Sequence, residues 1–260
     1  MPPPLAGRIA LVTGASRGIG YATALALANA GAHIVAVGRT VGGLEELDDA
    51  IKGAGGSATL VPLDLKDYDG IDRLGLALHE RFGRLDVLVG NAGILGPLSP
   101  LGHVESKAWH EVMAVNVTAN WRLICATDAL LKHSEAGRVV FVTSGITAQA
   151  PAYWGSYTVS KAALEALART YAAESASTRV RVNLFNPGPI RTRMRAQAMP
   201  GEDPLTLDTP DKAAEKIIDL CLPSTQENGK LYSYPMRRFL EFNALASLSS
   251  WPGVSRPSTS

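Results

Sequence analysis

Strand-like apolar runs alternate with helix-length segments along almost the whole chain. The runs that we expect to form strands are Ile9–Thr13, His33–Val37, Ala58–Pro62, Leu85–Gly90, Arg138–Val142, Val180–Phe185 and the shorter Lys230–Ser233. Helical patterns fill the segments between them, near 19–30, 42–54, 68–82, 105–133, 157–176 and 210–222. Because parallel strands need crossover connections, usually helices, this order predicts an α/β fold. We expect a doubly wound, mostly parallel sheet of about seven strands with helices on both faces.

The sequence shows no internal linker between domains and no repeat of the length found in solenoids. Residues 1–246 are therefore expected to form a single domain. The tail 247–260 ends in Ser-Arg-Pro-Ser-Thr-Ser and is polar and proline-bearing, so we expect it to fray.

The composition favours a cytoplasmic protein with no nucleic-acid or membrane partner. The formal net charge of +1 gives no general attraction to either. Two cysteines are too few for a disulfide framework, and the start lacks the basic and apolar regions of a signal peptide. The 21 uncharged residues from Gly18 to Gly38 divide into a helix-like half and a strand-like half, which indicates buried elements rather than a membrane span. The five histidines have no zinc-binding spacing, so no metal is expected.

A glycine-rich turn joins the first expected strand to the first expected helix. It reads Thr13-Gly14-Ala15-Ser16-Arg17-Gly18-Ile19-Gly20, which is not the G-x-G-x-x-G spacing of the common dinucleotide fingerprint. Glycines let the backbone turn tightly and approach a phosphate closely. The helix N-terminus that follows offers free N–H groups and partial positive charge to a pyrophosphate. The turn therefore indicates a phosphate site, with a ligand-free βα turn as the alternative.

Tyr157 and Lys161 are four residues apart at the start of a helical pattern, so their side chains share one helix face. An adjacent ammonium favours the phenolate and lowers the pKa of a tyrosine from its usual ~10. A tyrosine so placed can give or take a proton near neutral pH. The pair alone is also compatible with an ordinary amphipathic helix.

At four other positions, polar or small residues occur where they could contact a ligand. Asp64 follows a strand, where open α/β sheets bind ligands, although it could instead cap the next helix. Asn91-Ala92-Gly93 allows close approach of the backbone to a ligand, or forms a simple tight turn. Asn116 interrupts a helical pattern, where asparagine tends to rearrange backbone bonding. Ser144 ends a strand and is either an exposed reactive hydroxyl or a turn residue.

These motifs together resemble those of the short-chain dehydrogenase/reductase family, with bacterial reductases of the oxoacyl-reductase type as the nearest-looking members. The resemblance covers residues 8 to about 233, and the motifs occur in the order of the family. They are TGASRGIG at 13–20, Leu63-Asp64-Leu65, Gly90-Asn91-Ala92-Gly93, Asn116, Ser144, Tyr157 with Lys161, and Pro187-Gly188-Pro189-Ile190-Arg191-Thr192.

The resemblance implies a single Rossmann-type dinucleotide-binding and catalytic domain that transfers hydride between a nicotinamide cofactor and a carbonyl/alcohol substrate, as a ketoreductase does. It assigns proton transfer to Tyr157 and positioning of the substrate oxygen to Ser144. It implies that Lys161 lowers the pKa of Tyr157 and holds the nicotinamide ribose, that Asn116 anchors a relay water, and that Asp64 accepts from adenine. The implied cofactor-binding residues are Gly14, Ser16, Arg17, Gly18, Ile19, Gly20, Arg39, Asp64, Leu65, Asn91, Ala92, Gly93, Tyr157, Lys161, Pro187, Gly188, Ile190 and Thr192. The alternative is a non-catalytic dinucleotide-binding sensor or scaffold, although such proteins typically lose the tyrosine or the lysine.

The end of the second strand predicts NADP(H) as the cofactor rather than NAD(H). NAD-binding members carry an acidic residue there for the ribose 2′-hydroxyl. Here the position is Gly38, and no acid occurs before Glu45. Arg39 and Arg17 supply two guanidinium groups that can hold a 2′-phosphate by charge-assisted bonds.

The two long helical segments predict a homo-oligomer, either a tetramer or a dimer. They carry more apolar positions than one sheet face should cover, and the family pairs these helices across a two-fold axis. The positions are Trp121, Leu123, Leu130, Leu131, Leu164, Leu167 and Tyr171. Burial within one chain is the alternative.

Residues 191–209 are too long for an ordinary connection and contain two prolines and a glycine, which is typical of a mobile lid. Arg191 and Arg195 would share a face if Thr192 to Ala198 formed a short helix, with Arg193 nearby. We hypothesise contact with a distant anionic group of a small-molecule carbonyl substrate, such as a phosphopantetheine-linked acyl chain; solvated arginines are the alternative. Trp154 is either a substrate wall or a packed aromatic.

Overall fold

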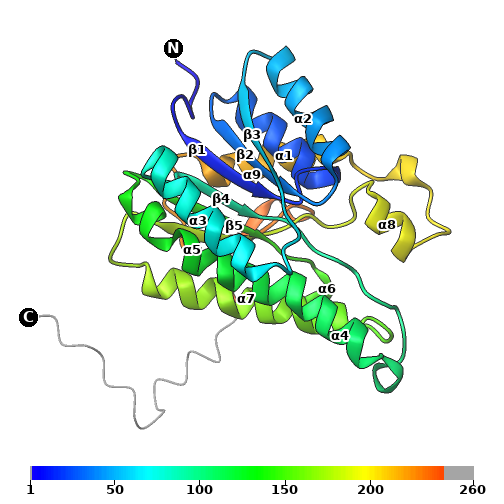
Figure 1. Ribbon diagram of the computed structural model, residues 1–260. Coiled ribbons are helices and arrows are strands. Elements are labelled where there is room, and N and C mark those ends of the chain that lie inside the picture. The colour runs from blue at the N-terminus through cyan, green and yellow to red at the C-terminus, as the bar shows by residue number, and fades with distance from the viewer. Residues whose placement is uncertain (1, 243–260) are drawn as a thin grey trace, which may run out of the picture.

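In residues 2–242, which the computed structural model describes, one eight-stranded sheet forms the centre of the protein (Figure 1). Its order is β3-β2-β1-β4-β5-β6-β7-β8; β1 to β7 pair in parallel, and β8 pairs antiparallel with β7. The strands are β1 (Ile9–Thr13), β2 (His33–Gly38), β3 (Ser57–Pro62), β4 (Val87–Gly90), β5 (Arg138–Val142), β6 (Arg181–Asn186), β7 (Leu231–Ser233) and β8 (Arg238–Leu240). The predicted parallel sheet is confirmed.

Helices cover both faces of the sheet, as the sequence predicts. Along β1, Ala10 and Val12 pack into the core cluster with α1, α2 and α9, whereas Ile9 and Leu11 pack into the cluster with α3, α5 and α7. The α-helices are α1 (Gly18–Asn29), α2 (Val41–Gly53), α3 (Tyr68–Phe82), α4 (Ser106–Met113), α5 (Ala119–His133), α6 (Ile146–Gln149), α7 (Gly155–Glu174), α8 (Arg193–Ala198) and α9 (Pro210–Cys221). Short 3₁₀ turns form at Leu101–His103 and Pro204–Thr206.

The strand order reverses between β1 and β4, which is the point where open α/β sheets bind their ligands. Hydrogen bonds join the carboxyl ends of these two strands. The Asn91 side-chain amide donates to the Thr13 carbonyl at 2.9 Å, and the Asn91 backbone N–H donates to Thr13 Oγ1 at 3.0 Å. A cleft is therefore built at this edge before any ligand binds.

Two parts of the secondary structure differ from the sequence prediction. The segment 105–133 is not one helix, because a π-helical turn at Ala114–Thr118 separates α4 from α5. This turn contains Asn116, so the expected rearrangement of backbone bonding there is confirmed. The edge strand β8 is not predicted, because its three residues carry no apolar alternation long enough to detect.

The apolar excess that suggested an oligomer is mostly buried within the chain. Leu123, Leu130, Leu131, Leu164 and Tyr171 are all at most 4% exposed, and Leu167 packs against the same core. Of the predicted positions, Trp121 alone is exposed, at 47%. The inference that these positions need a partner subunit is wrong for the buried residues. They pack into the core that α3, α5 and α7 form with one face of the sheet. The oligomeric state stays a prediction.

The predicted frayed tail at 247–260 lies outside the described residues, as do the last positions of the expected domain. No helix within residues 2–242 is both long enough and apolar enough to cross a membrane.

Candidate active site

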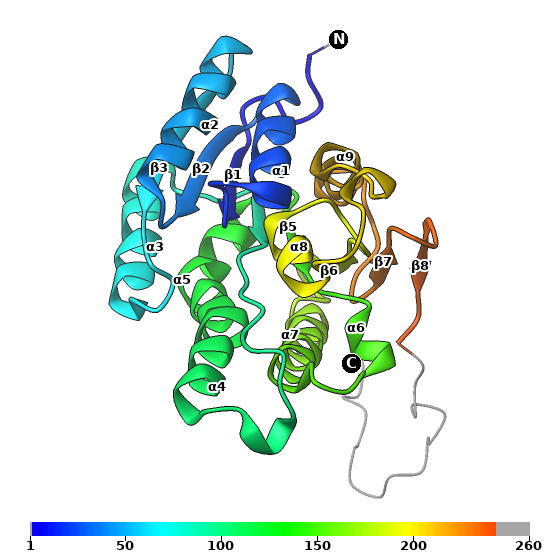
Figure 2. The ribbon, with the colours of Figure 1, turned by 90° about the vertical axis from the view of Figure 1, so that its right-hand side faces the viewer.

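A cavity of about 880 Å³ opens along the carboxyl ends of the parallel strands. It is lined by the turns after β1, β2, β3, β4, β5 and β6 and by α8, which stands apart from the helices that cover the sheet (Figures 1 and 2). Nearly all of the predicted site residues line it. The exceptions are Gly20 and Asn116, which lie behind the lining.

The glycine-rich turn is shaped by close backbone contacts. Gly14 and Gly18 have φ of +65° and +59°, a region that favours glycine. A Cβ at Gly20 would lie 2.3 Å from the Gly14 carbonyl oxygen and 2.4 Å from Asn91 Nδ2, so α1 can pack here only without a side chain. Arg17 precedes α1 in extended conformation, and no side chain caps the first N–H groups of the helix. These N–H groups suit an anion such as a pyrophosphate.

We expect Gly20→Ala to destabilise the protein, because the new methyl meets backbone that cannot move aside. An overpacking cost of ~1–3 kcal/mol corresponds to a fall in Tm of roughly 2–12 °C for a chain of this size. Gly42→Ala is the matched control, since nothing lies within 4 Å of a Cβ at Gly42 in α2. Thermal unfolding of the two variants measures the difference. Equal Tm values would show that the turn tolerates a side chain.

The end of β2 carries no acidic side chain, and its backbone lies close to its neighbours. A Cβ at Gly38 would lie 3.2 Å from Leu44 Cδ2 and 3.4 Å from Ser16 Cβ. The first turn of α2 carries no acidic residue, and exposed Arg39 lines the cavity together with Arg17. This corner of the cavity therefore presents two guanidinium groups and no carboxylate of its own from β2 or α2.

Asp64 lines the cavity and does not cap a helix. The N-cap of α3 is Asp67, whose Oδ1 accepts from the Gly70 N–H at 2.9 Å. Asp64 Oδ1 instead accepts from the Lys66 N–H at 3.0 Å. The capping alternative for Asp64 is thus wrong, and its carboxylate remains available at the cavity edge.

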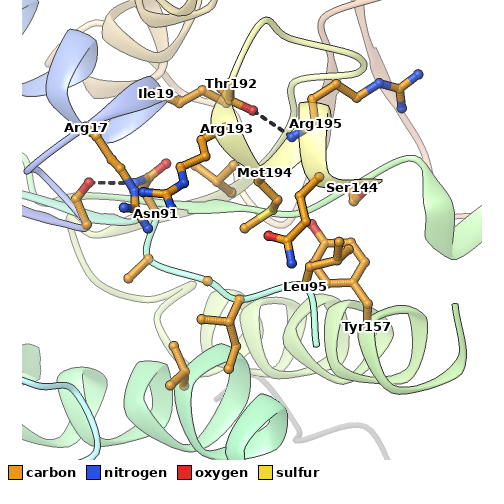
Figure 3. Close-up of a pocket in the computed structure, with 18 of the residues that line it drawn as sticks. Arg17, Ile19, Asn91, Leu95, Ser144, Tyr157, Thr192, Arg193, Met194 and Arg195 are labelled. Carbon is orange, nitrogen blue, oxygen red and sulfur yellow. Dashed lines mark hydrogen bonds between the residues drawn. The ribbon is translucent and has the colours of Figure 1, made fainter. Parts of the chain in front are cut away.

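Tyr157, Ser144 and Lys161 come together where α7 begins below the end of β5 (Figure 3 shows the first two). Tyr157 is 8% exposed and lies beside Ser144 at the same end of the cavity. Lys161 Nζ donates to the Val142 carbonyl at 2.8 Å and lies 5.8 Å from the centre of the Tyr157 ring. A Cβ at Gly93 would lie 3.4 Å from this Nζ, which explains the small residues after β4.

Burial has the largest effect on the pKa values of Tyr157 and Lys161. It raises the pKa of Tyr157 to about 12, against the lowering effect of the Ser144 hydroxyl. It lowers the pKa of Lys161 to about 8, against the raising effect of the Glu165 carboxylate. Desolvation of the phenolate sets the net direction of the Tyr157 pKa. The lowering expected from the Lys161 ammonium stays a prediction. The Lys161 ammonium is directed to a backbone carbonyl instead.

Asn116 holds the loop after β4 from behind the cavity. Its Nδ2 donates to the Ile94 carbonyl and to Ser160 Oγ, each at 2.9 Å, and its Oδ1 accepts from the Ile94 N–H at 2.9 Å. Ser160 precedes Lys161 on α7. The asparagine thus fixes both the cavity wall and the helix that carries the lysine.

Sequence reasoning missed Asn186, which shapes the site, and left two alternatives open for Trp154. Asn186 Oδ1 accepts from the Gly145 N–H at 2.9 Å and from the Gly188 N–H at 3.0 Å, which ties the Ser144 loop to the turn after β6. Its signal was an asparagine at a strand end before Pro187-Gly188. Trp154 lines the cavity and packs edge-on against the Tyr157 ring with 6.2 Å between ring centres, so it is both wall and packed aromatic.

The predicted short helix after Thr192 forms as α8, and Thr192 Oγ1 accepts from the Arg195 N–H at 3.2 Å. Arg195 belongs to the cavity lining, but its guanidinium is paired with Glu202, because both its Nε and its Nη2 donate to the Glu202 carboxylate at 2.6 Å. In Figure 3, Arg195 points away, whereas Arg193 and Met194 point into the cavity. The hypothesis that Arg195 meets substrate is therefore not supported by this arrangement.

The fold and the cleft define an α/β protein of the dinucleotide-binding class, with a polar Tyr, Ser and Lys group beside the expected position of the cofactor. Comparison with known proteins adds the family. The family model of short chain dehydrogenases matches residues 8–203. The chain therefore belongs to the short-chain dehydrogenase/reductase family of oxidoreductases, which use nicotinamide cofactors.

Individual relatives match over most of their length. The oxidoreductase YciK of Escherichia coli (strain K12) is 39% identical over 206 residues, which are 78% of this chain and 81% of the relative. The cis-4-hydroxycyclohexanecarboxylate dehydrogenase of Sinomonas cyclohexanicum is 36% identical over 225 residues, which are 83% of this chain and 89% of the relative. A short chain dehydrogenase of Shigella flexneri 2a str. 301, solved in complex with NADP, has a TM-score of 0.85 and 35% identity, covering 90% of this chain and 99% of the other.

Proposed function

We propose that this protein is a ketoreductase that transfers hydride between NADP(H) and a carbonyl/alcohol substrate. The observation that carries the proposal is the buried Tyr157 side chain, beside Ser144 and close to Lys161, at one end of a cavity whose other end is the glycine-rich turn. Four side chains proposed as catalytic, Asn116, Ser144, Tyr157 and Lys161, are all present and buried or lining the cavity.

In the proposed mechanism, Ser144 and Tyr157 hold the substrate oxygen by donating hydrogen bonds to it. Tyr157 releases its proton to that oxygen during carbonyl reduction and takes it back from the alcohol in the reverse direction. A bound nicotinamide supplies or accepts the hydride. Lys161 stabilises the charge that develops on the phenol oxygen and is placed to bind the nicotinamide ribose. Asn116 keeps Ile94 and Ser160 in place and is the proposed anchor of a relay water.

The choice of NADP(H) rests on the corner formed by Gly38, Arg39 and Arg17. Gly38 supplies no carboxylate that would repel a 2′-phosphate, and the two arginines can bind that phosphate. The complex of the Shigella flexneri relative with NADP agrees with this choice. Other relatives are named as NAD-dependent oxidoreductases, so the cofactor has to be measured for this chain.

The direct test is oxidation of NADPH with a panel of ketones, diketones and acyl thioesters. The panel should include cyclohexanone and 4-oxocyclohexanecarboxylate, a matched neutral and anionic pair. Turnover of any member supports the proposal. NADPH binding with no turnover across the panel would instead favour the non-catalytic sensor or scaffold.

The cavity walls near Tyr157 are mostly apolar, with Leu95, Val112, Trp154 and Met194 among them. We therefore propose a substrate that is apolar next to its carbonyl group. Arg191 and Arg193, which both line the cavity, are the residues that could bind an anionic end of such a substrate. The oxoacyl chain suggested by the sequence remains one such substrate.

We expect Arg195→Ala to leave the preference between an acyl-coenzyme A and its uncharged short thioester unchanged within about twofold at low and high salt, because Glu202 already neutralises this arginine. Arg193→Ala is the matched variant, since Arg193 points into the cavity. If the lid binds an anionic group, only the Arg193 variant should lose preference for the charged thioester at low salt. A loss with Arg195→Ala would contradict the assignment.

We also propose that the protein is cytoplasmic and assembles as a homotetramer or homodimer. Exposed Trp121 on α5 is the apolar residue that remains to support an interface. Light scattering at micromolar concentration measures the assembly.

A further inference from the structure

A buried carboxylate outside the proposed catalytic group lies one helical turn beyond Lys161. Glu165 is 8% exposed and shares a face of α7 with Lys161, which is 3% exposed. Burying a carboxylate is costly unless it is hydrogen-bonded or paired. The contacts of Glu165 therefore call for an explanation.

Those contacts lead to the loop that carries Ser144. Glu165 Oε1 accepts from Thr143 Oγ1 at 2.7 Å and lies 3.0 Å from Thr147 Oγ1. The Thr147 hydroxyl also lies 3.1 Å from the Ser144 carbonyl and can donate to one of the two acceptors at a time. One carboxylate oxygen is thus bonded by residues on both sides of Ser144.

The same carboxylate acts on Lys161. Glu165 raises the pKa of the lysine against the effect of burial. Burial raises the pKa of Glu165 itself, and the Thr143 and Thr147 hydroxyls, Arg169 and Lys161 oppose that rise. The other charged group that acts on Glu165 is Arg169, also on α7. Arg169 is exposed, so water screens its charge, whereas the Lys161 and Glu165 charges are both buried.

We infer that Glu165 is a positioning residue for the proposed reaction, which fixes the Ser144 loop through Thr143 and Thr147 and keeps Lys161 protonated at neutral pH. The inference rests on the proposed function of Ser144 and Lys161. It makes two separable claims, one about geometry and one about charge. Glutamine retains an oxygen that can accept from the threonines but removes the charge, whereas leucine removes both.

The charge claim is tested with Glu165→Gln. If carbonyl reduction needs a protonated Lys161, its rate falls as the pH rises through the pKa of this lysine. Loss of the Glu165 carboxylate lowers that pKa. We therefore expect the alkaline limb of the pH profile of kcat/KM to move to lower pH by roughly one pH unit, the size of the effect of a nearby opposite charge. Glu174→Gln on the exposed end of α7 is the control and should leave the limb in place. An unmoved limb in Glu165→Gln overturns the charge claim.

The geometry claim is tested with Glu165→Leu, for which we expect kcat to fall roughly 10- to 100-fold at every pH, as misplaced catalytic groups do. If this variant does not fold, Thr147→Val is the substitute. It removes one of the two hydroxyls that contact Glu165, at a half-buried position, and should also lower kcat. Wild-type kcat in the variant that folds overturns the geometry claim.

A measurement without turnover separates this inference from the proposed function. The Cε resonance of Lys161 can be titrated by NMR in protein labelled with ¹³C-lysine and assigned with Lys161→Met. A lower midpoint in Glu165→Gln than in wild type and in Glu174→Gln supports the inference even if no ketone in the panel is reduced. Identical midpoints overturn the charge claim even if the enzyme is fully active.

Discussion

Replacing Tyr157 by phenylalanine is expected to lower kcat for carbonyl reduction at least ~10²-fold while NADPH still binds, on the scale of general acid–base catalysis. The phenol is buried, and burial raises its pKa to about 12, so it is protonated at neutral pH. Protonated tyrosine is the form that can donate to a carbonyl oxygen. Phenylalanine keeps the packing against Trp154 and removes the proton donor alone.

Tyr153→Phe is the matched control for this substitution. The Tyr153 ring is 60% exposed and belongs to the same segment, but its side chain is not part of the cavity lining. The control should keep wild-type kcat. Steady-state rates with one accepted ketone, together with NADPH titration by fluorescence, measure both effects. Turnover close to wild type in Tyr157→Phe would exclude Tyr157 as the proton donor and leave the catalytic assignment without its main residue.

Exchanging Arg39 for aspartate is expected to shift cofactor preference from NADPH toward NADH. Loss of one charge-assisted hydrogen bond, ~1.5–3 kcal/mol, corresponds to a decrease of roughly 10- to 150-fold in kcat/KM for NADPH. The new carboxylate would also repel the 2′-phosphate and can accept from the 2′-hydroxyl of NADH. Arg39 is exposed at the cavity edge, so the substitution should not disturb the core.

Arg179→Asp makes the same change of net charge just before β6, at the amino end of the strand and away from the cavity, and is the control. Its ratio of kcat/KM for the two cofactors should equal that of wild type. The proposed NADP(H) preference requires wild type itself to favour NADPH. Equal or higher kcat/KM with NADH in wild type would show that the two arginines do not bind a 2′-phosphate.

The sequence alone predicts the sheet and most of the cavity because the signals involved are local. β1 forms at the predicted residues, since a continuous apolar run is what a strand buried on both faces requires. The glycine turn needs small residues at fixed offsets along one segment, and Tyr157 and Lys161 need only helical spacing to share a face. For these features, the short stretch of chain contains the physical cause.

Other parts of the site depend on contacts between segments far apart in the chain. The π-helical turn can be suspected from Asn116, but its partners Ile94 and Ser160 are 22 and 44 residues away. The sequence does not distinguish Arg195 from Arg191 and Arg193. Only the folded conformation of the segment after β6 places Glu202 against Arg195. The apolar faces of α5 and α7 suggested a partner subunit, whereas the core of the chain already buries most of the predicted apolar positions.

The sequence by itself determined the order of strands and helices along the chain, the glycine-rich turn and the identity of the polar residues that line the cavity, because periodicity and spacing act within one segment. The tertiary structure decided the protonation of Tyr157 and Lys161 and the partners of Glu165 and Arg195. The physical reason is that desolvation and charge pairing depend on which side chains from distant segments exclude water from a group. Spacing along a helix placed Lys161 near Tyr157, but burial set the pKa of both.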